Sequence, residues 1–245
     1  MLKHSLYLVI AFHFFLLNKP LAQGISTDTT FYTSAADNVI KLYTDSVREN
    51  LRLYNGNEFT GNYPGVPGHP FFEFPEPRKG EVFYDGTRYP NVLLSYDIIN
   101  DDIIFNNPVS NRVIKLVARR VEWFTIQNHL FVHIRADTNT TNFPGAGFYE
   151  VLYEGAGVVL TRRKKQFEPS IRTEEASRFI EWTWYYVKKD AVYYAVKNRR
   201  SLLAICRDQK KAVAEFMGKE KLNFKNDPAN TIVKVIDYYT QIKKN

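Results

Sequence analysis

The chain has 245 residues, which suits one α+β domain or one domain with a helical appendage. Aromatic residues make up 15% of it, and since Tyr, Phe and Trp favour pleated, half-buried surfaces, this composition favours strands. The net charge is +7, and removal of Lys3 and Lys19 with residues 1–23 would leave +5. This mild positive charge does not call for nucleic acid as a partner.

Residues 1–23 have the layout of a secretory signal peptide. A short basic start at Lys3 is followed by an apolar run over 6–17, a break at Pro20 and small-residue cleavage choices near Ala22. The alternative is a membrane anchor, but about a dozen apolar residues fall short of the roughly 20 that span a bilayer. We therefore expect a secreted, periplasmic or cell-envelope protein with no transmembrane helix after cleavage.

Cys206 is the only cysteine, so no disulfide can form within the chain. It lies in the apolar, helical pattern of 201–206. This setting favours a small buried hydrophobic residue over a nucleophile.

The mature segment 24–245 is expected to be a single domain. Helical spacing predicts a helix over 34–54, ended by Asn55-Gly56. The Pro- and Gly-rich segment 57–80 is predicted to be a loop, packed on the core because it also carries five aromatic residues. Alternating patterns predict an antiparallel sheet over 81–197, and apolar stripes predict C-terminal helices over 199–243.

Nine short alternating segments mark the expected strands. They cover 82–84, 92–96, 103–105, 112–118, 130–134, 148–153, 158–162, 182–187 and 192–196. Asp85-Gly86 between the first two is a strong hairpin signal. The predicted fold is thus α+β, a curled antiparallel meander of about seven to nine strands flanked by an N-terminal helix and a C-terminal helical segment.

Several segments occur in an order that resembles a group of uncharacterised secreted proteins from Bacteroidota. They are 53–56, 84–86, 147–155, 162–165, 185–190 and 221–224. The resemblance implies export and a single-domain layout, and it implies no activity and no catalytic residue.

The sequence offers little catalytic chemistry. His129 and His133 fall in a strand pattern, where four residues span about 13 Å, so they could not easily share a metal ion. Nucleophile elbows and phosphate-binding loops are missing. We therefore predict no catalytic residues, no cofactor site and no metal site.

If the protein is an enzyme, its carboxylates are the best candidates for catalytic residues. A glycoside hydrolase needs two carboxyl groups that face each other across a sugar. Candidates are Asp97, Asp101, Asp102, Glu150 and Glu154, although Asp101 and Asp102 are more simply read as part of a turn.

Arg162, Arg163, Lys164 and Lys165 form the sharpest charge feature. Continued as a strand, they alternate between its two faces. They could contact an anionic surface, or they could form a solvated strand end that blocks edge pairing, which the sequence favours.

These observations favour an exported, monomeric, non-catalytic binding or structural module. Its expected partner is an envelope protein or a glycan, with weak binding to anionic surfaces possible through 162–165. The alternative is an Asp- or Glu-dependent enzyme directed at carbohydrate or lipid.

Overall fold

The computed structural model describes residues 53, 56–61, 66–107, 112–136, 141–170 and 177–244. The predicted signal peptide, 1–23, lies outside these residues. So does the predicted helix 34–54, except for Leu53, which is helical and 1% exposed.

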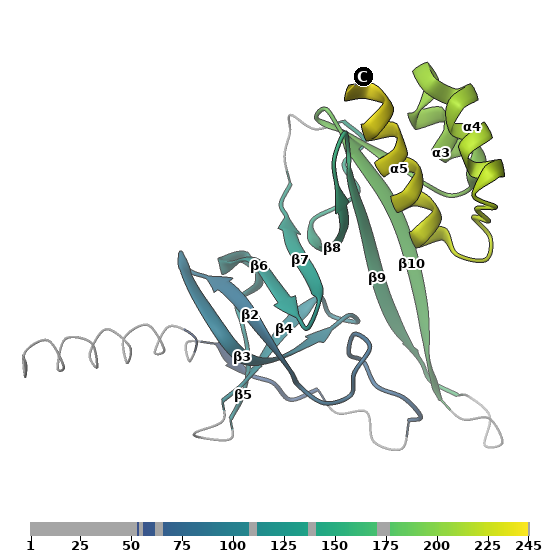
Figure 1. Ribbon diagram of the computed structural model, residues 1–245. Helices are drawn as coiled ribbons and strands as arrows, with labels where there is room; N and C mark the ends of the chain where they lie inside the picture. The colour runs from purple at the N-terminus through teal and green to yellow at the C-terminus, as the bar shows by residue number, and fades with distance from the viewer. Residues whose placement is uncertain are drawn as a thin grey trace, which may run out of the picture. The chain divides into compact units, whose positions relative to one another are not determined.

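The described residues form one antiparallel sheet of eleven strands with helices at the C-terminal end (Figure 1). The fold is therefore α+β with a large sheet, as predicted. The strands lie in the order β1-β5-β4-β3-β2-β6-β7-β8-β9-β10-β11. Their bounds are β1 Asn57–Glu58, β2 Arg78–Tyr84, β3 Thr87–Asp97, β4 Asp102–Asn106, β5 Val113–Lys115, β6 Val121–Ile126, β7 His129–Ile134, β8 Gly147–Glu154, β9 Val158–Glu168, β10 Arg178–Lys189 and β11 Val192–Ala195.

The expected count of seven to nine strands is wrong, because β1 and β6 were not predicted. β1 has only two residues, too few to show an alternating pattern. It is recognised as a strand only through its pairing with the end of β5. In β6 the buried residues Val121 and Phe124 are three apart, which breaks the period of two. A register shift opposite Phe83 and Tyr84 of β2 accommodates this spacing.

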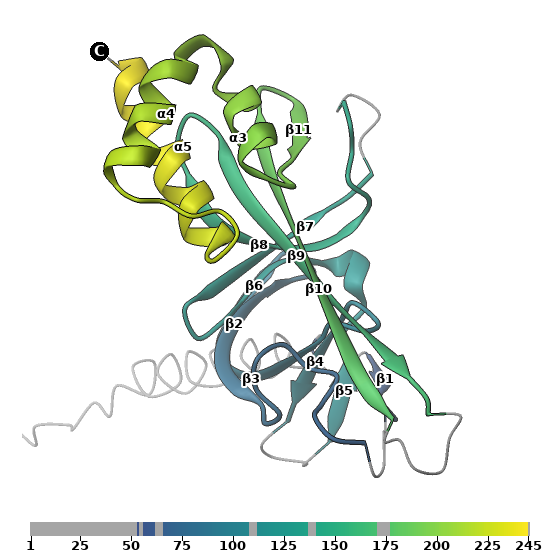
Figure 2. The ribbon, with the colours of Figure 1, turned by 90° about the vertical axis from the view of Figure 1, so that its right-hand side faces the viewer.

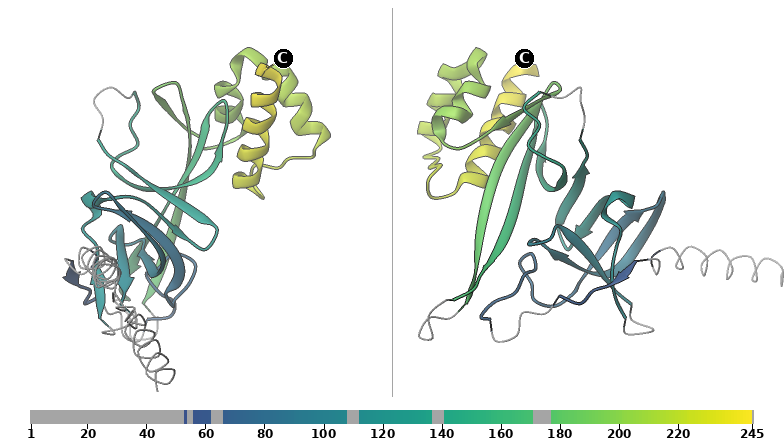
Figure 3. Two further views of the ribbon diagram at one scale, coloured as in Figure 1. Left: turned by 60° about the vertical axis from the view of Figure 1, so that its left-hand side comes forward. Right: turned by 180° about the vertical axis from the view of Figure 1, so that it is seen from behind.

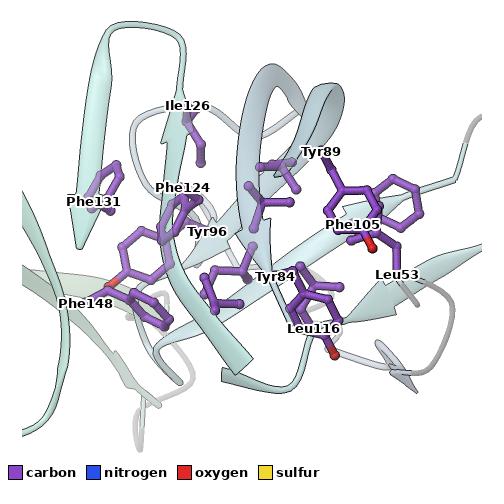
Figure 4. Close-up of a cluster of buried hydrophobic side chains, with 14 of the residues drawn as sticks. Leu53, Tyr84, Tyr89, Tyr96, Phe105, Leu116, Phe124, Ile126, Phe131 and Phe148 are labelled. Carbon is purple, nitrogen blue, oxygen red and sulfur yellow. The ribbon is translucent and has the colours of Figure 1, made fainter. Parts of the chain in front are cut away.

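Strands β2 to β8 contribute to an aromatic core. Tyr96, Phe124, Phe131 and Phe148 contact one another from four different strands, with ring centroids 4.7–6.0 Å apart (Figure 4). The predicted hairpin at Asp85-Gly86 is present, and both residues have the positive φ angles that a type I′ turn requires. These contacts explain the high aromatic content.

The described part of the segment 57–80 packs on this core, as predicted, but it is not wholly irregular. It contains β1, and β2 begins at Arg78 rather than at 81. Phe72 is 2% exposed, and its ring meets Phe131 edge-on at 5.0 Å. Phe72 is thus an anchor that fixes the segment to the sheet.

Three α-helices cover one face of the sheet at β8 to β10 (Figures 1 and 3). They are α3 Arg199–Ile205, α4 Lys210–Lys219 and α5 Pro228–Lys244. The described residues also include the short 3₁₀ helices Ala118–Arg120 and Arg207–Gln209. Asp227 caps α5 by accepting a hydrogen bond from the Asn230 N–H at 3.1 Å. The predicted apolar stripe of α5 is buried, namely Ile232, Val235, Ile236 and Tyr239.

Candidate functional site

The four basic residues singled out in the sequence all lie in β9 and alternate between its faces. Arg162 points to the face opposite the helices. Its guanidinium donates to the carbonyl of Ala146 at 2.9 Å and to the Tyr149 hydroxyl at 3.1 Å, and it pairs with Asp101 at 3.3 Å. The side chain is only 12% exposed, so Arg162 is held by internal partners.

On the other face, Arg163 donates to the Glu150 carboxylate at 2.6 Å, and its guanidinium lies 5.0 Å from the centre of the Phe72 ring. Lys165 donates to the carbonyl oxygens of His69 and Phe71 at 3.1 and 2.7 Å. Burial lowers the pKa of the Lys165 ammonium. Three of the four cations therefore hold the fold together.

These residues do not form a solvated strand end. β9 pairs with β10 over 158–168, and on its other side the Lys165 N–H donates to the carbonyl of Ile98 at 3.0 Å. Contact between residues 162–165 and an anionic surface stays a prediction. Lys164 is the member of the group to which the structure assigns no ion pair among the described residues.

The candidate carboxylates also have structural partners. Asp97 is fully buried and accepts hydrogen bonds from the backbone N–H groups of Ile99 and Asn100 at 2.8 and 3.2 Å, which fixes the turn between β3 and β4. Asp101 accepts the Tyr96 hydroxyl at 2.5 Å, and Asp102 pairs with Lys115 at 3.2 Å. The sequence interpretation as a turn is confirmed for Asp101, whereas Asp102 is the first residue of β4.

Glu150 is 5% exposed in its side chain and lies between Arg163 and His129. The His129 Nδ1 is 2.6 Å from Glu150, and its Nε2 is 3.3 Å from Glu73. His129 thus fills the space between the two carboxylates. Among the described residues, no group of three or more His, Cys, Asp or Glu side chains could hold a metal ion.

A different surface, which the sequence did not single out, lies on β10. Trp182 and Trp184 point to the same face of this strand and are 40% and 42% exposed. Their cross-strand neighbours on β9 are Lys164 and Arg162. Large exposed aromatic side chains are uncommon away from contact surfaces, so this pair marks a candidate binding site.

The outer edge of β10 is open beside these tryptophans. β11 pairs with β10 only over 186–189, and the last hydrogen bond on this side runs from the Val196 N–H to the carbonyl of Tyr185 (Figure 2). Because backbone direction alternates along a strand, Thr183 and Glu181 direct their N–H and C=O groups to the same side as Tyr185. No backbone hydrogen bond from the described part of the chain reaches these four groups.

A pocket of about 490 Å³ adjoins this open edge. Thr183, Trp184 and Tyr185 line it on the strand side, and Phe224, Lys225 and Pro228 line it on the helical side. A second pocket, of about 510 Å³, shares Asn198, Phe224 and Lys225 with the first and extends along α4. Together the two pockets form the edge groove, whose volume is in the usual range for binding sites.

The edge groove is positively charged. Lys197, Arg199, Lys221 and Lys225 line it, all four are exposed, and none is in an ion pair with a described residue. No Asp or Glu lines either pocket. The groove therefore combines an aromatic wall with an unneutralised cationic rim, which favours ligands that carry negative charge.

The sequence contains a weak signal for this surface. The pattern Glu181-Trp182-Thr183-Trp184 alternates polar and aromatic residues, as a half-buried strand does. Both tryptophans are exposed on the face of β10 that the helices do not cover, which no local pattern reveals. The cations of the groove come from two separate segments, 197–199 and 221–225, so no local pattern could reveal them.

Comparisons with known proteins do not assign this chain to a family. The chain matches no protein-family model, and no curated protein or solved structure is significantly similar to it. Within the described ranges, no helix has the length and apolar character needed to cross a membrane.

Proposed function

We propose that this protein is an exported, non-catalytic binding module, and that it holds a partner protein in the edge groove. One observation carries the proposal: Trp182 and Trp184 are exposed beside an open strand edge and a cationic groove. Aromatic and basic side chains are enriched at protein contact surfaces, and Trp is the residue most often found at their energetic centre.

The groove fits a protein better than a glycan because of the open backbone edge. Stacking on tryptophan suits a sugar as well as a side chain. Main-chain N–H and C=O groups in a strand geometry, however, match the spacing of another polypeptide. The location outside the cytoplasm rests on residues 1–23, so sequencing the N-terminus of the exported protein tests it, with a start near Gln23 or Gly24 expected.

An enzyme using Asp or Glu has less support. The Glu150 carboxylate is engaged by Arg163 and His129, and Asp97 is engaged by backbone N–H groups. No carboxylate lines the edge groove, and none lines a further pocket of about 350 Å³ between Tyr194 of β11 and Ser201 of α3. A binding role needs neither a general acid nor a general base.

The test is photo-crosslinking at the groove in cells that export the protein. A benzoylphenylalanine placed at Trp184 should give a discrete protein adduct, whose partner is then identified and purified. The purified partner should bind the wild-type protein, and Trp184→Ala should weaken the affinity at least tenfold. Tyr194→Ala is the matched control, because Tyr194 is similarly exposed at 37% but lies outside the edge groove.

Absence of any adduct at Trp184, or a purified partner that binds Trp184→Ala as tightly as wild type, would contradict the proposal. Binding of a glycan that Trp184→Ala abolishes would overturn the protein partner and point to carbohydrate recognition.

A further inference from the structure

We infer that the partner enters the edge groove as an extended, acidic peptide segment that adds a strand to β10. This inference rests on the proposed function, and it specifies how the partner is held and what its chemistry is. Three independent features of the structure lead to it: the open edge, the two walls beside that edge, and the charge of the groove.

The first feature is the backbone of β10. Thr183 and Glu181 present two N–H donors and two C=O acceptors in line with the hydrogen bond that Tyr185 makes to Val196. An incoming strand would continue the sheet from the point where β11 leaves it. Peptides that bind in this way obtain affinity from main-chain hydrogen bonds, whatever their sequence.

The second feature is the presence of a wall on each side of this edge. Trp182 and Trp184 stand on the face opposite the helices, and Phe224 and Lys225 stand on the helical side. Side chains of an added strand alternate between the two faces. One set would therefore lie against the tryptophans, and the other would enter the pocket.

The third feature is charge. Side chains that enter the pocket meet Lys197 and Lys225, with Arg199 and Lys221 further along the groove, and no lining carboxylate offsets these four cations. Asp227 and Glu181 lie nearby; Asp227 caps the start of α5 and keeps its charge, and Glu181 is 3.8 Å from Lys165, so the four cations outnumber these carboxylates. Carboxylates at alternate positions of the segment would thus be favoured, with apolar side chains between them.

A synthetic probe tests this directly. Fluorescein-labelled Gly-Glu-Val-Glu-Val-Glu-Val-Gly is titrated with the purified full chain, and anisotropy is measured. We expect saturable binding that weakens at least tenfold when the salt concentration rises from 0.05 to 0.5 M. A probe with Lys in place of Glu should not bind.

N-methylation of alternate amides in the Glu probe keeps its charge and its side chains but removes the edge hydrogen bonds. Strand addition predicts at least a tenfold loss of affinity for this probe. Because the protein itself is unchanged, the comparison holds even if an edge variant fails to fold. Equal binding of the methylated and unmethylated probes would overturn strand addition.

Variants of the protein provide the second arm. Thr183→Pro removes an N–H that points away from β9, so it should abolish probe binding, while Thr183→Val should retain it. Lys225→Glu should weaken binding about tenfold, and Lys211→Glu, an exposed position on α4 outside the groove, should not. Binding that survives both Thr183→Pro and Lys225→Glu would overturn the inference.

The two proposals can fail separately. A protein adduct at Trp184 without any binding of the acidic probe would leave the binding function in place and overturn the acidic, extended segment. Probe binding that requires Trp184 but not the amide N–H groups would overturn strand addition alone and leave the acidic partner and the binding function in place. Loss of the adduct at Trp184 would remove the proposed function itself.

Discussion

The guanidinium of Arg163 lies 2.6 Å from the buried carboxylate of Glu150 and 5.0 Å from the centre of the Phe72 ring. This contact joins β9 to β8 and to the segment that precedes β2. Since Glu150 also contacts His129 on β7, one buried carboxylate connects three neighbouring strands.

Removal of this cation should be costly. Arg163→Met leaves the Glu150 carboxylate, which is 5% exposed, without its charged partner, and breaking a buried pair costs about 3–5 kcal/mol. The free energy of unfolding, measured by urea denaturation, should fall by that amount. Arg178→Met, which removes an exposed pair with Glu168, should change it by about 1 kcal/mol or less. Arg163→Met combined with Glu150→Gln should recover part of the loss.

The buried face of α5 provides a second test of stability. Ile236 is 1% exposed, so Ile236→Asp places an unpaired charge in the core between the helices and the sheet. We expect a loss of about 4 kcal/mol or more, or failure to fold. Lys234→Asp, on the exposed side of the same helix, should have little effect. An unchanged melting temperature for Ile236→Asp would show that α5 does not depend on this packing.

Tyr149 should make stability sensitive to alkaline pH. Burial raises the pKa of its phenol to about 12, from an ordinary value of 10.0, and the hydroxyl donates to the carbonyl oxygen of Gly145 at 2.9 Å. A pKa that is higher in the folded state means that stability is fully present below pH 10 and is lost as pH rises toward 12. The difference in unfolding free energy between wild type and Tyr149→Phe should therefore shrink over this range. A constant difference would contradict the raised pKa.

Cys206 should be chemically inert in the folded protein. Its side chain is fully buried, and burial raises the pKa of the thiol to about 11, so very little thiolate exists at pH 8. A thiol-reactive dye should label almost none of the native protein and one thiol per chain in denaturant. Rapid labelling of the native protein would show that the helical layer opens.

Binding to anionic surfaces through residues 162–165 should be weak. Arg162, Arg163 and Lys165 are 12%, 21% and 12% exposed in their side chains, so Lys164 alone of the four is available to a membrane. One lysine near an anionic bilayer contributes about 1 kcal/mol. In co-sedimentation with phosphatidylglycerol vesicles at 0.15 M salt we expect at most a fivefold effect of Lys164→Gln, and any stronger binding should depend on the exposed cations of the edge groove instead. Strong binding that Lys164→Gln abolishes would establish a membrane contact at β9.

The sequence by itself determined the local features of this protein. The hairpin at Asp85-Gly86 and the apolar stripe of the C-terminal helical segment were predicted because each depends on residues that are near one another in the chain. Period-two patterns likewise indicated strands and the alternation of Arg162 and Arg163 between faces. These follow from backbone sterics and from the burial of apolar side chains, which act over a few residues.

The tertiary structure decided which strands are neighbours and which edge stays open. A period of two sets the faces of a strand but does not choose its partner, so the pairing of β6 with β2 and the contact between Arg163 and Glu150 could not be predicted. The basic run shows this most clearly: its charge suggested an exposed surface, yet packing against β8 and the 66–77 segment made most of it internal. Trp184 is an example of the opposite outcome, because a tryptophan would be expected in a core. β11 pairs with β10 only over 186–189, so the edge of β10 beside Trp184 stays uncovered and the edge groove is open.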